Sequence, residues 1–208
     1  MDYKLIILFL AAYLIGSIPT ALIIGQSFYH KDVRQYGSGN IGTTNAYRVL
    51  GPRAGTVVLV LDVLKGALAA SLPLWCGYSD RHLILLIGLG AVLGPSFSIY
   101  IRFPGGKSVA TSDGILLAYN PEFFLIAAAV YLLIVTVSSM VSVASTLGCI
   151  LVLLLSYFYH DWVLSLIIAA VTVFVLIRHR SNFRRIFNGT ENLVPFGLVY
   201  RLRQKKQK

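Results

Sequence analysis

The chain has 208 residues, of which 57% are hydrophobic and 12% charged, and this composition excludes an ordinary water-soluble domain and indicates a polytopic membrane protein. The net charge is nevertheless +10, so the basic residues must lie in loops and tails, where their placement reports topology. Cys76 and Cys149 both lie in apolar runs, which argues against a disulfide framework, a thiolate metal site and a cysteine nucleophile.

Seven apolar segments are predicted membrane helices, at residues 3–25, 54–76, 82–100, 108–119, 122–138, 141–159 and 162–178. The first is longer than the core of a signal peptide, so we interpret it as a retained span, with a cleaved signal as the alternative. The fourth is short and carries Asp113, so we expect it inside a helical bundle. The predicted fold is all-α, with about seven transmembrane helices in one membrane-embedded domain over residues 1–208.

The basic residues are distributed asymmetrically. Fifteen of the 18 lie in alternate connections and from residue 178 onward, namely Lys31, Arg34, Arg48, Arg53, Arg102, Lys107, Arg178, Arg180, Arg184, Arg185, Arg201, Arg203, Lys205, Lys206 and Lys208. If segment 108–119 crosses the membrane, the positive-inside rule puts the N-terminus outside and the C-terminus in the cytoplasm; if it dips in and returns, the later topology changes. We expect the basic cytoplasmic tail, residues 179–208, to be attracted to anionic lipid headgroups.

The segment 37–48, GSGNIGTTNAYR, is polar and glycine-rich in an otherwise apolar chain. Its glycine spacing formally matches a dinucleotide fingerprint, which we reject because no βαβ unit surrounds it. One interpretation is a flexible connector. The other is a nest for an oxyanion, with donors from Ser38, Asn40 and Thr44 and with Arg48 as counter-charge. Thr44 and Arg48 are four residues apart and would share a face if a helix begins here.

A second basic segment runs from Arg102 to Ser108. Its Gly-Lys-Ser ending resembles a phosphate-binding loop, but the full spacing fails because Ile101 stands where the first glycine is required. What remains is a pair of glycines, Lys107 and a hydroxyl that opens a helix, whose N-terminus favours anions. The alternative is a plain turn with a lysine that extends to the membrane surface.

A third basic segment, 178–185, leaves the last apolar run. Arg178, Asn182 and Arg185 follow helical spacing and would form one polar face. The alternative is a stop-transfer cluster of charges. Ser142 and Ser145 begin the sixth apolar segment, where they could bond backbone carbonyls or contribute to a site.

One charged pair lies inside an apolar segment. Asp62 and Lys65 are three residues apart within 54–76, so they can pair on one helix and offset their burial. We favour this structural pairing over a direct role toward a substrate.

These motifs together resemble the bacterial membrane acyltransferases that use acyl phosphate to acylate glycerol 3-phosphate. The resemblance covers nearly the whole chain, through GSIP at 16–19, GSGNIGTTNAYRVLG at 37–51, LDVLKG at 61–66, GGKSVAT at 105–111, VSVAS at 141–145 and RHRSNFRRIFNGTEN at 178–192. It implies seven spans, an extracellular N-terminus and a site that faces the cytoplasm, at the bacterial cell membrane. It also implies no cofactor, no metal and no nucleic acid, with the soluble enzyme that makes acyl phosphate as a partner.

The chain departs from this family at several positions. The central motif usually reads Lys-Gly-Gly-Lys-Gly, whereas here Pro104 and Ser108 stand at its two ends and Lys107 is retained. A histidine is usual where this chain has Pro95, and a basic residue is usual just before the serine motif, where this chain has Ser138-Ser139-Met140. We expect a divergent member whose rate and substrate preference are the properties affected.

The resemblance implies a site for two phosphate groups. Ser38, Asn40 and Arg48 would bind one phosphate, and Lys107 and Arg178 would neutralise the other together with the charge that develops during the reaction. The remaining predicted site residues are His179 as candidate base, and Thr44, Ser145 and Asn182 as substrate-binding groups. The leaving phosphate is the alternative base.

Other chemistries are weighed against this one. The His-x4-Asp dyad of other glycerophosphate acyltransferases is excluded because no histidine has an aspartate five residues later, which also argues against acyl-CoA as donor. An organic-phosphate or anion transporter would have polar groups near the membrane midplane and access from both sides, whereas the polar residues here fall on one side. A catalytically impaired paralogue that acts as a membrane scaffold is the remaining alternative.

Overall fold

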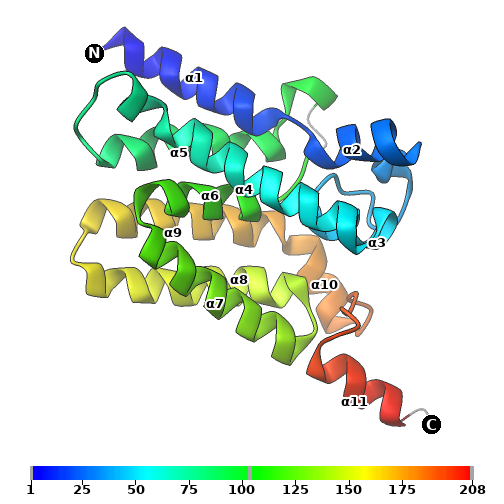
Figure 1. Cartoon of the computed structure of the whole chain (residues 1–208). Coiled ribbons are helices and arrows are strands. Elements are labelled where there is room, and N and C mark those ends of the chain that lie inside the picture. The colour runs from blue at the N-terminus through cyan, green and yellow to red at the C-terminus, as the bar shows by residue number, and fades with distance from the viewer. Residues whose placement is uncertain (1, 103–104, 207–208) are drawn as a thin grey trace. The chain divides into compact units, whose positions relative to one another are not determined.

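The computed structural model describes residues 2–102 and 105–206, and within these residues the regular structure is entirely helical (Figure 1). The contacts divide the chain into two compact units, Met1–Phe124 and Leu125–Lys208. The single domain expected over residues 1–208 stays a prediction.

The first unit contains six helices, α1 (Tyr3–Ser17), α2 (Thr20–Tyr29), α3 (Thr43–Leu50), α4 (Pro52–Trp75), α5 (His82–Ser96) and α6 (Val109–Tyr119). Two short 3-10 turns, Val33–Gln35 and Ile99–Ile101, lie in its connections. Helix α5 packs against α1, α4 and α6, and α4 packs in turn against α3 and α6 (Figure 1). The short helix α6 thus has neighbours on two sides, as expected for a helix inside a bundle.

Glycines let these helices approach closely. A Cβ on Gly66 of α4 would overlap the backbone of Thr111 in α6, and a Cβ on Gly114 of α6 would overlap the carbonyl of Val63 in α4. Helices in a membrane associate mainly through such close packing, because lipid chains are as apolar as the side chains themselves. The backbone of α6 is therefore held directly against that of α4.

The predicted first span, 3–25, is in fact two helices, α1 and α2, interrupted at Ile18 and Pro19. Proline has no N–H and clashes with the preceding turn, so a continuous helix is broken at this point. The carbonyl of Ile18 instead accepts a hydrogen bond from Lys65 Nζ at 2.9 Å. The two helices together cover 27 residues, Tyr3–Tyr29.

Helix α7 (Pro121–Ser138) begins at the end of the first unit and continues into the second, which also contains α8 (Val141–Ser156), α9 (Trp162–Arg178), α10 (Arg180–Phe187) and α11 (Leu198–Lys206). Helices α8 and α9 form a hairpin through the 3-10 turn Tyr157–Tyr159. Asp161 caps α9, because its Oδ1 accepts a hydrogen bond from Leu164 N at 3.0 Å. Helices α9 and α10 are bent by 56° at His179.

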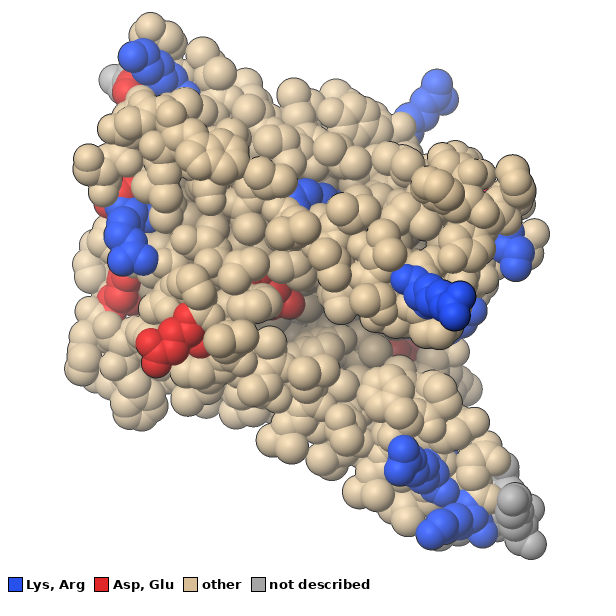
Figure 2. Space-filling model, in the orientation of Figure 1, with Lys and Arg blue, Asp and Glu red and all other residues tan. Residues whose placement is uncertain are grey.

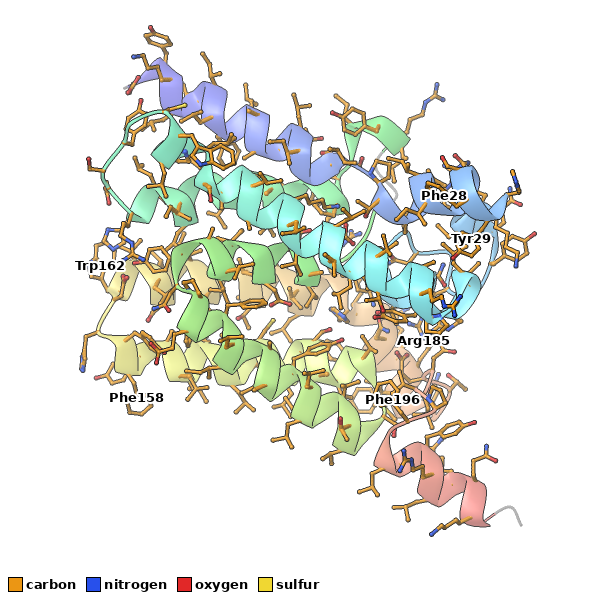
Figure 3. All side chains as sticks on the ribbon, viewed as in Figure 1. Phe28, Tyr29, Phe158, Trp162, Arg185 and Phe196 are labelled. Carbon is orange, nitrogen blue, oxygen red and sulfur yellow. The ribbon has the colours of Figure 1, made fainter. Side chains whose placement is uncertain are left out.

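Exposed aromatic side chains lie at the ends of the apolar helices. Phe158 and Trp162 lie at the α8–α9 connection and point outward, and Phe28 and Tyr29 lie at the end of α2 (Figure 3). Aromatic residues are enriched at the two membrane–water interfaces. We therefore expect the α8–α9 connection to lie at one membrane boundary and the α7–α8 connection, at the other end of α8, to lie at the opposite one.

All seven predicted apolar segments are helical. Five helices are long and apolar enough to cross a membrane, or six if α9 and α10 count as one bent span, while α6 is shorter. The protein is therefore an all-α polytopic membrane protein. The count of seven spans and the orientation of the termini stay predictions.

A test of the α4–α6 contact is Gly114→Ala. The added Cβ would overlap Val63, so we expect α6 to shift, with a loss of about 1–3 kcal/mol in stability and a lower unfolding temperature in detergent. Gly148→Ala is the matched control, because a Cβ there would lie 3.9 Å from Ile134 Cδ1. Equal unfolding temperatures for the two variants would contradict the close contact.

Candidate functional site

The segment 37–48 folds around the side chain of Asn45, which is fully buried. Its Nδ2 donates to Val33 O at 2.8 Å and to Tyr36 O at 3.2 Å, and its Oδ1 accepts from Ser38 N at 2.9 Å. Gly37 and Gly39 have left-handed backbones, with φ of 62° and 69°, which glycine adopts without strain. The segment is therefore an ordered turn and not a flexible connector.

The predicted binding residues of this segment lie on that turn and on α3, which begins at Thr43. Asn40 Oδ1 accepts from Gly42 N at 2.9 Å, which leaves the two N–H donors of its amide for another group. Ser38 is exposed, and its Oγ lies 3.5 Å from Asn40 N. The helical conformation confirms that Thr44 and Arg48 share a face, with Arg48 exposed.

Segment 105–108 is held against the end of α5. Gly106 N donates to Pro95 O at 2.6 Å, and Ser96 Oγ donates to Gly106 O at 3.0 Å. Pro95 therefore acts through its backbone carbonyl, which any residue at this position would supply. Lys107 is half-buried at this turn, and Pro104 lies outside the described residues.

Ser108 precedes α6 with a left-handed φ of 62°. Its hydroxyl donates to Val92 O at 2.5 Å and makes no capping hydrogen bond to the first turn of α6. The hydroxyl residue predicted at the helix start is therefore in place, but its side chain does not cap the helix. The Oγ atoms of Ser96 and Ser108 lie 3.0 Å apart. Glycine adopts a left-handed backbone without steric strain, which accounts for the glycine that is usual at this position. Ser108 adopts the same conformation although it has a Cβ.

The two segments lie beside each other within the first unit. A Cβ built on Gly106 would lie 3.7 Å from Asn40 Oδ1. The structure thus brings Asn40 to the turn that carries Lys107. An amide and a lysine ammonium are both groups that bind anions, and here they come from neighbouring segments of the chain.

Asp62 connects this site to the helices beneath it. Its Oδ2 accepts from Thr43 Oγ1 at 3.1 Å, at the first residue of α3, and its Oδ1 accepts from Thr20 Oγ1 at 2.5 Å, at the first residue of α2. Lys65 Nζ lies 2.7 Å from Asp62 Oδ1 and also donates to Ile18 O. Both charged side chains are buried, at 7% and 8% exposure, so the predicted structural pairing is confirmed.

In the second unit the polar residues gather around Glu191. Its Oε1 accepts from Asn182 Nδ2 at 2.7 Å and from Ser142 Oγ at 2.9 Å, and its Oε2 accepts from Arg185 Nε at 2.8 Å. Burial raises the pKa of Glu191, but hydrogen bonds from Asn182, Arg185 and Ser142 outweigh it, so the pKa lies below the ordinary value.

The predicted face of Arg178, Asn182 and Arg185 is confirmed only for Asn182 and Arg185, which lie on α10 and both bond Glu191. Arg178 ends α9, whereas Asn182 and Arg185 lie on α10 beyond the bend at His179, so the three residues share no continuous helix. Ser142 bonds the carboxylate of Glu191 and not a backbone carbonyl. Ser145 is buried one turn further along α8, and Arg178 is half-buried.

His179 is buried at the bend, and its Nδ1 lies 2.8 Å from Val175 O. A carbonyl oxygen can only accept, so Nδ1 carries the proton and Nε2 carries the lone pair when the ring is neutral. This is the tautomer that a base acting through Nε2 requires.

Sequence reasoning missed Asn45 and Glu191. Asn45 stands inside the quoted motif, but nothing in its spacing shows that its amide closes the turn. Glu191 had a signal, because it is the single acidic residue after Asp161 in a strongly basic stretch. Among the described residues, no group of three or more His, Cys, Asp and Glu side chains could hold a metal ion.

Comparisons with known proteins agree with the resemblance. A family model described as glycerol-3-phosphate acyltransferase matches residues 6–189. The chain is 58% identical over 204 residues to the glycerol-3-phosphate acyltransferase of Latilactobacillus sakei subsp. sakei (strain 23K), with 98% of this chain and 99% of that protein covered. It is 59% identical over 203 residues to that of Lactiplantibacillus plantarum, with 97% and 98% covered.

Two crystal structures are also similar. They are of PlsY (YgiH), an integral membrane glycerol 3-phosphate acyltransferase. Its glycerol 3-phosphate form is 32% identical with a TM-score of 0.85, covering 92% of this chain and 96% of that one. Its lysophosphatidic acid form is 30% identical with a TM-score of 0.82, covering 93% and 96%.

The Asp62–Lys65 pair can be tested by a double-mutant cycle. Asp62→Asn or Lys65→Met leaves its partner buried without a counter-charge, so each should cost about 3–5 kcal/mol of stability, while the double variant should recover much of it. Unfolding in detergent measures this, with the exposed Asp80→Asn as control. Additive losses in the double variant would show that the two side chains do not act as a pair.

The Glu191 cluster predicts a pH dependence. Because the folded-state pKa is lowered, the contribution of Glu191 to stability is fully present above the ordinary glutamate pKa and is lost as pH falls through the lowered value. Glu191→Gln should therefore be less stable at neutral pH and lose less stability on acidification. Unfolding temperature against pH measures this, with the exposed Glu122→Gln as control. Parallel curves for Glu191→Gln and the unchanged protein would refute it.

Proposed function

The chain belongs to the glycerol-3-phosphate acyltransferase family, and we propose that its segments 37–48 and 105–108 bind the phosphate groups of the reactants. It is an integral membrane enzyme that transfers a fatty acyl group from acyl phosphate to the 1-hydroxyl of glycerol 3-phosphate. The products are lysophosphatidic acid and phosphate, and the reaction belongs to phospholipid biosynthesis.

This proposal rests on the short distance between Asn40 and the Gly106–Lys107 turn, where a Cβ on Gly106 would lie 3.7 Å from Asn40 Oδ1. Ser38, Asn40 and Arg48 are assigned to one phosphate, with Thr44 on the same helical face as Arg48. Lys107 is assigned to the acyl phosphate, where its charge stabilises the negative charge that grows on the leaving oxygen. A lysine ammonium gives this stabilisation as a compact point charge.

In the reaction the 1-hydroxyl oxygen attacks the acyl carbonyl carbon, the bond from that carbon to the phosphate oxygen breaks, and phosphate leaves with the bonding pair. The hydroxyl proton goes to His179 Nε2 or to the departing phosphate. Arg178 is assigned to charge neutralisation, and Asn182 and Ser145 to substrate binding. Asn182 already donates one N–H to Glu191, which fixes the direction of its amide.

The protein is a bacterial membrane protein, as its relatives and its apolar helices indicate. We place its site on the cytoplasmic side, because 15 of 18 basic residues fall on connections assigned to that side. A cytoplasmic site would take acyl phosphate from the soluble enzyme that makes it, and that enzyme is the proposed partner.

Purified protein with acyl phosphate and labelled glycerol 3-phosphate, scored for lysophosphatidic acid, tests the assignment. Arg48→Ala and Lys107→Ala should each lower turnover by about 100-fold or more with the protein still folded. Arg53→Ala, which removes an exposed arginine at the start of α4, is the matched control and should leave turnover near normal.

Other outcomes are distinguishable in the same assay. Near-normal turnover in Lys107→Ala would remove that residue from the mechanism. A His179→Gln protein with most of its activity would identify the leaving phosphate as the base. Uptake of labelled glycerol 3-phosphate into vesicles without product would indicate a transporter, and binding without product or uptake would indicate a scaffold.

A further inference from the structure

The turn between α7 and α8 holds the C-terminal segment. Ser139 is fully buried and has a left-handed φ of 59°. Its carbonyl accepts from Val194 N at 2.8 Å, and its Oγ accepts from Tyr200 N at 2.9 Å. Gly197 lies so close that a Cβ there would overlap the Ser139 side chain. The start of α11 is thus fixed at one point of the second unit.

The two helices that flank Ser139 indicate where this point lies relative to the membrane. Ser139 lies between the end of α7 and the start of α8, and both helices are long and apolar enough to span. The exposed aromatic residues of the α8–α9 connection mark the other end of α8. The turn that holds α11 is therefore at a membrane boundary, and α11 starts there.

Helix α11 has an apolar edge flanked by cations. Leu198 and Leu202 are 51% and 50% exposed, and Phe196 just before the helix is 53% exposed. At about 100° per residue, Leu198 and Leu202 lie about 40° apart on one edge, and the position of Lys206 falls between that edge and the half-buried Val199. By the same geometry the exposed Arg201 and Lys205 fall on one side of this edge and Arg203 falls on the other. Figure 2 shows basic side chains at the surface of this end of the chain.

Acidic residues are absent from this stretch of the sequence, since none occurs after Glu191. A helix with a narrow apolar edge and flanking cations is typical of segments that lie in the membrane interface. Lysine and arginine near the surface are attracted to anionic phospholipid headgroups, and their stems extend along the apolar region.

We propose that α11 is an interfacial helix, held by Ser139 at the membrane boundary, with its leucines in the headgroup region and its cations on anionic phospholipids. The lipid surface is favoured over a protein partner because the tether places the helix at the boundary and the apolar edge is only two turns long. This surface binding is separate from the acyl transfer assigned to the other polar segments.

The test uses the full-length protein with both native cysteines replaced by serine, reconstituted into vesicles of phosphatidylcholine alone or of phosphatidylcholine and phosphatidylglycerol in equal parts. An environment-sensitive fluorophore is attached at Leu202→Cys or, as matched control, at Gln204→Cys on the opposite side of α11. A nitroxide-labelled phospholipid acts as quencher. It quenches the fluorophore whichever way the protein is oriented in the vesicle.

We expect several-fold stronger quenching at position 202 than at 204 in the vesicles with phosphatidylglycerol. High salt, or the combined change of Arg201, Arg203 and Lys205 to Gln, should weaken it. Gly197→Ala should also weaken it, because the tether to Ser139 is displaced, whereas Gly148→Ala should not. The proposed activity is measured on the same samples, and its failure would leave the quenching result unaffected.

Equal quenching at 202 and 204, or quenching indifferent to phosphatidylglycerol, would overturn the proposal. If position 202 is protected from quenching, and this protection grows with the protein-to-lipid ratio, the apolar edge of α11 would instead bind a second copy of the chain. Protection that requires an added soluble protein would assign it to a protein partner.

Discussion

The buried pair of Asp62 and Lys65 is the interaction on which the first unit depends. A carboxylate taken out of water is costly unless it is paired and hydrogen-bonded, and Asp62 meets that requirement with donors from three helices. Thr43 is one of those donors and begins α3, so the carboxylate also fixes the start of the helix that carries Arg48. Because Lys65 also donates to the carbonyl of Ile18, just before Pro19, one pair ties together the break after α1, the start of α2 and the start of α3.

The second unit repeats this solution with a different carboxylate. Glu191 lies after α10, yet it bonds Ser142 on α8 and Asn182 and Arg185 on α10. A chain that turns sharply at His179 loses the continuous helical hydrogen bonds that would otherwise direct α10. The three bonds to one carboxylate replace them, and they also orient the amide of Asn182, a residue assigned to the substrate.

The sequence predicted those features whose partners lie within one helix. The seven apolar segments are helical because length and composition alone determine them, and Asp62 pairs with Lys65 because a spacing of three residues places both on one face. Asn45 was missed because its partners come from a turn, whose conformation no spacing reveals. Glu191 was missed because it lies outside any helix and bonds residues of two different helices, which no spacing relates to it. The face proposed for Arg178 and Asn182 failed for the related reason that helical spacing assumes a helix that does not bend.

The described departures from the family pattern lie in turns between helices or next to them. Pro95 supplies only its carbonyl to Gly106, and Ser108 adopts a left-handed conformation suited to glycine while its hydroxyl bonds Val92 O. Ser138-Ser139-Met140 stands where a basic residue is usual, and Ser139 there accepts hydrogen bonds from Val194 N and Tyr200 N. Lys107 is retained between these changes. The divergence of this chain therefore lies in how its turns are supported, and it leaves in place the lysine and amide groups assigned to the phosphates.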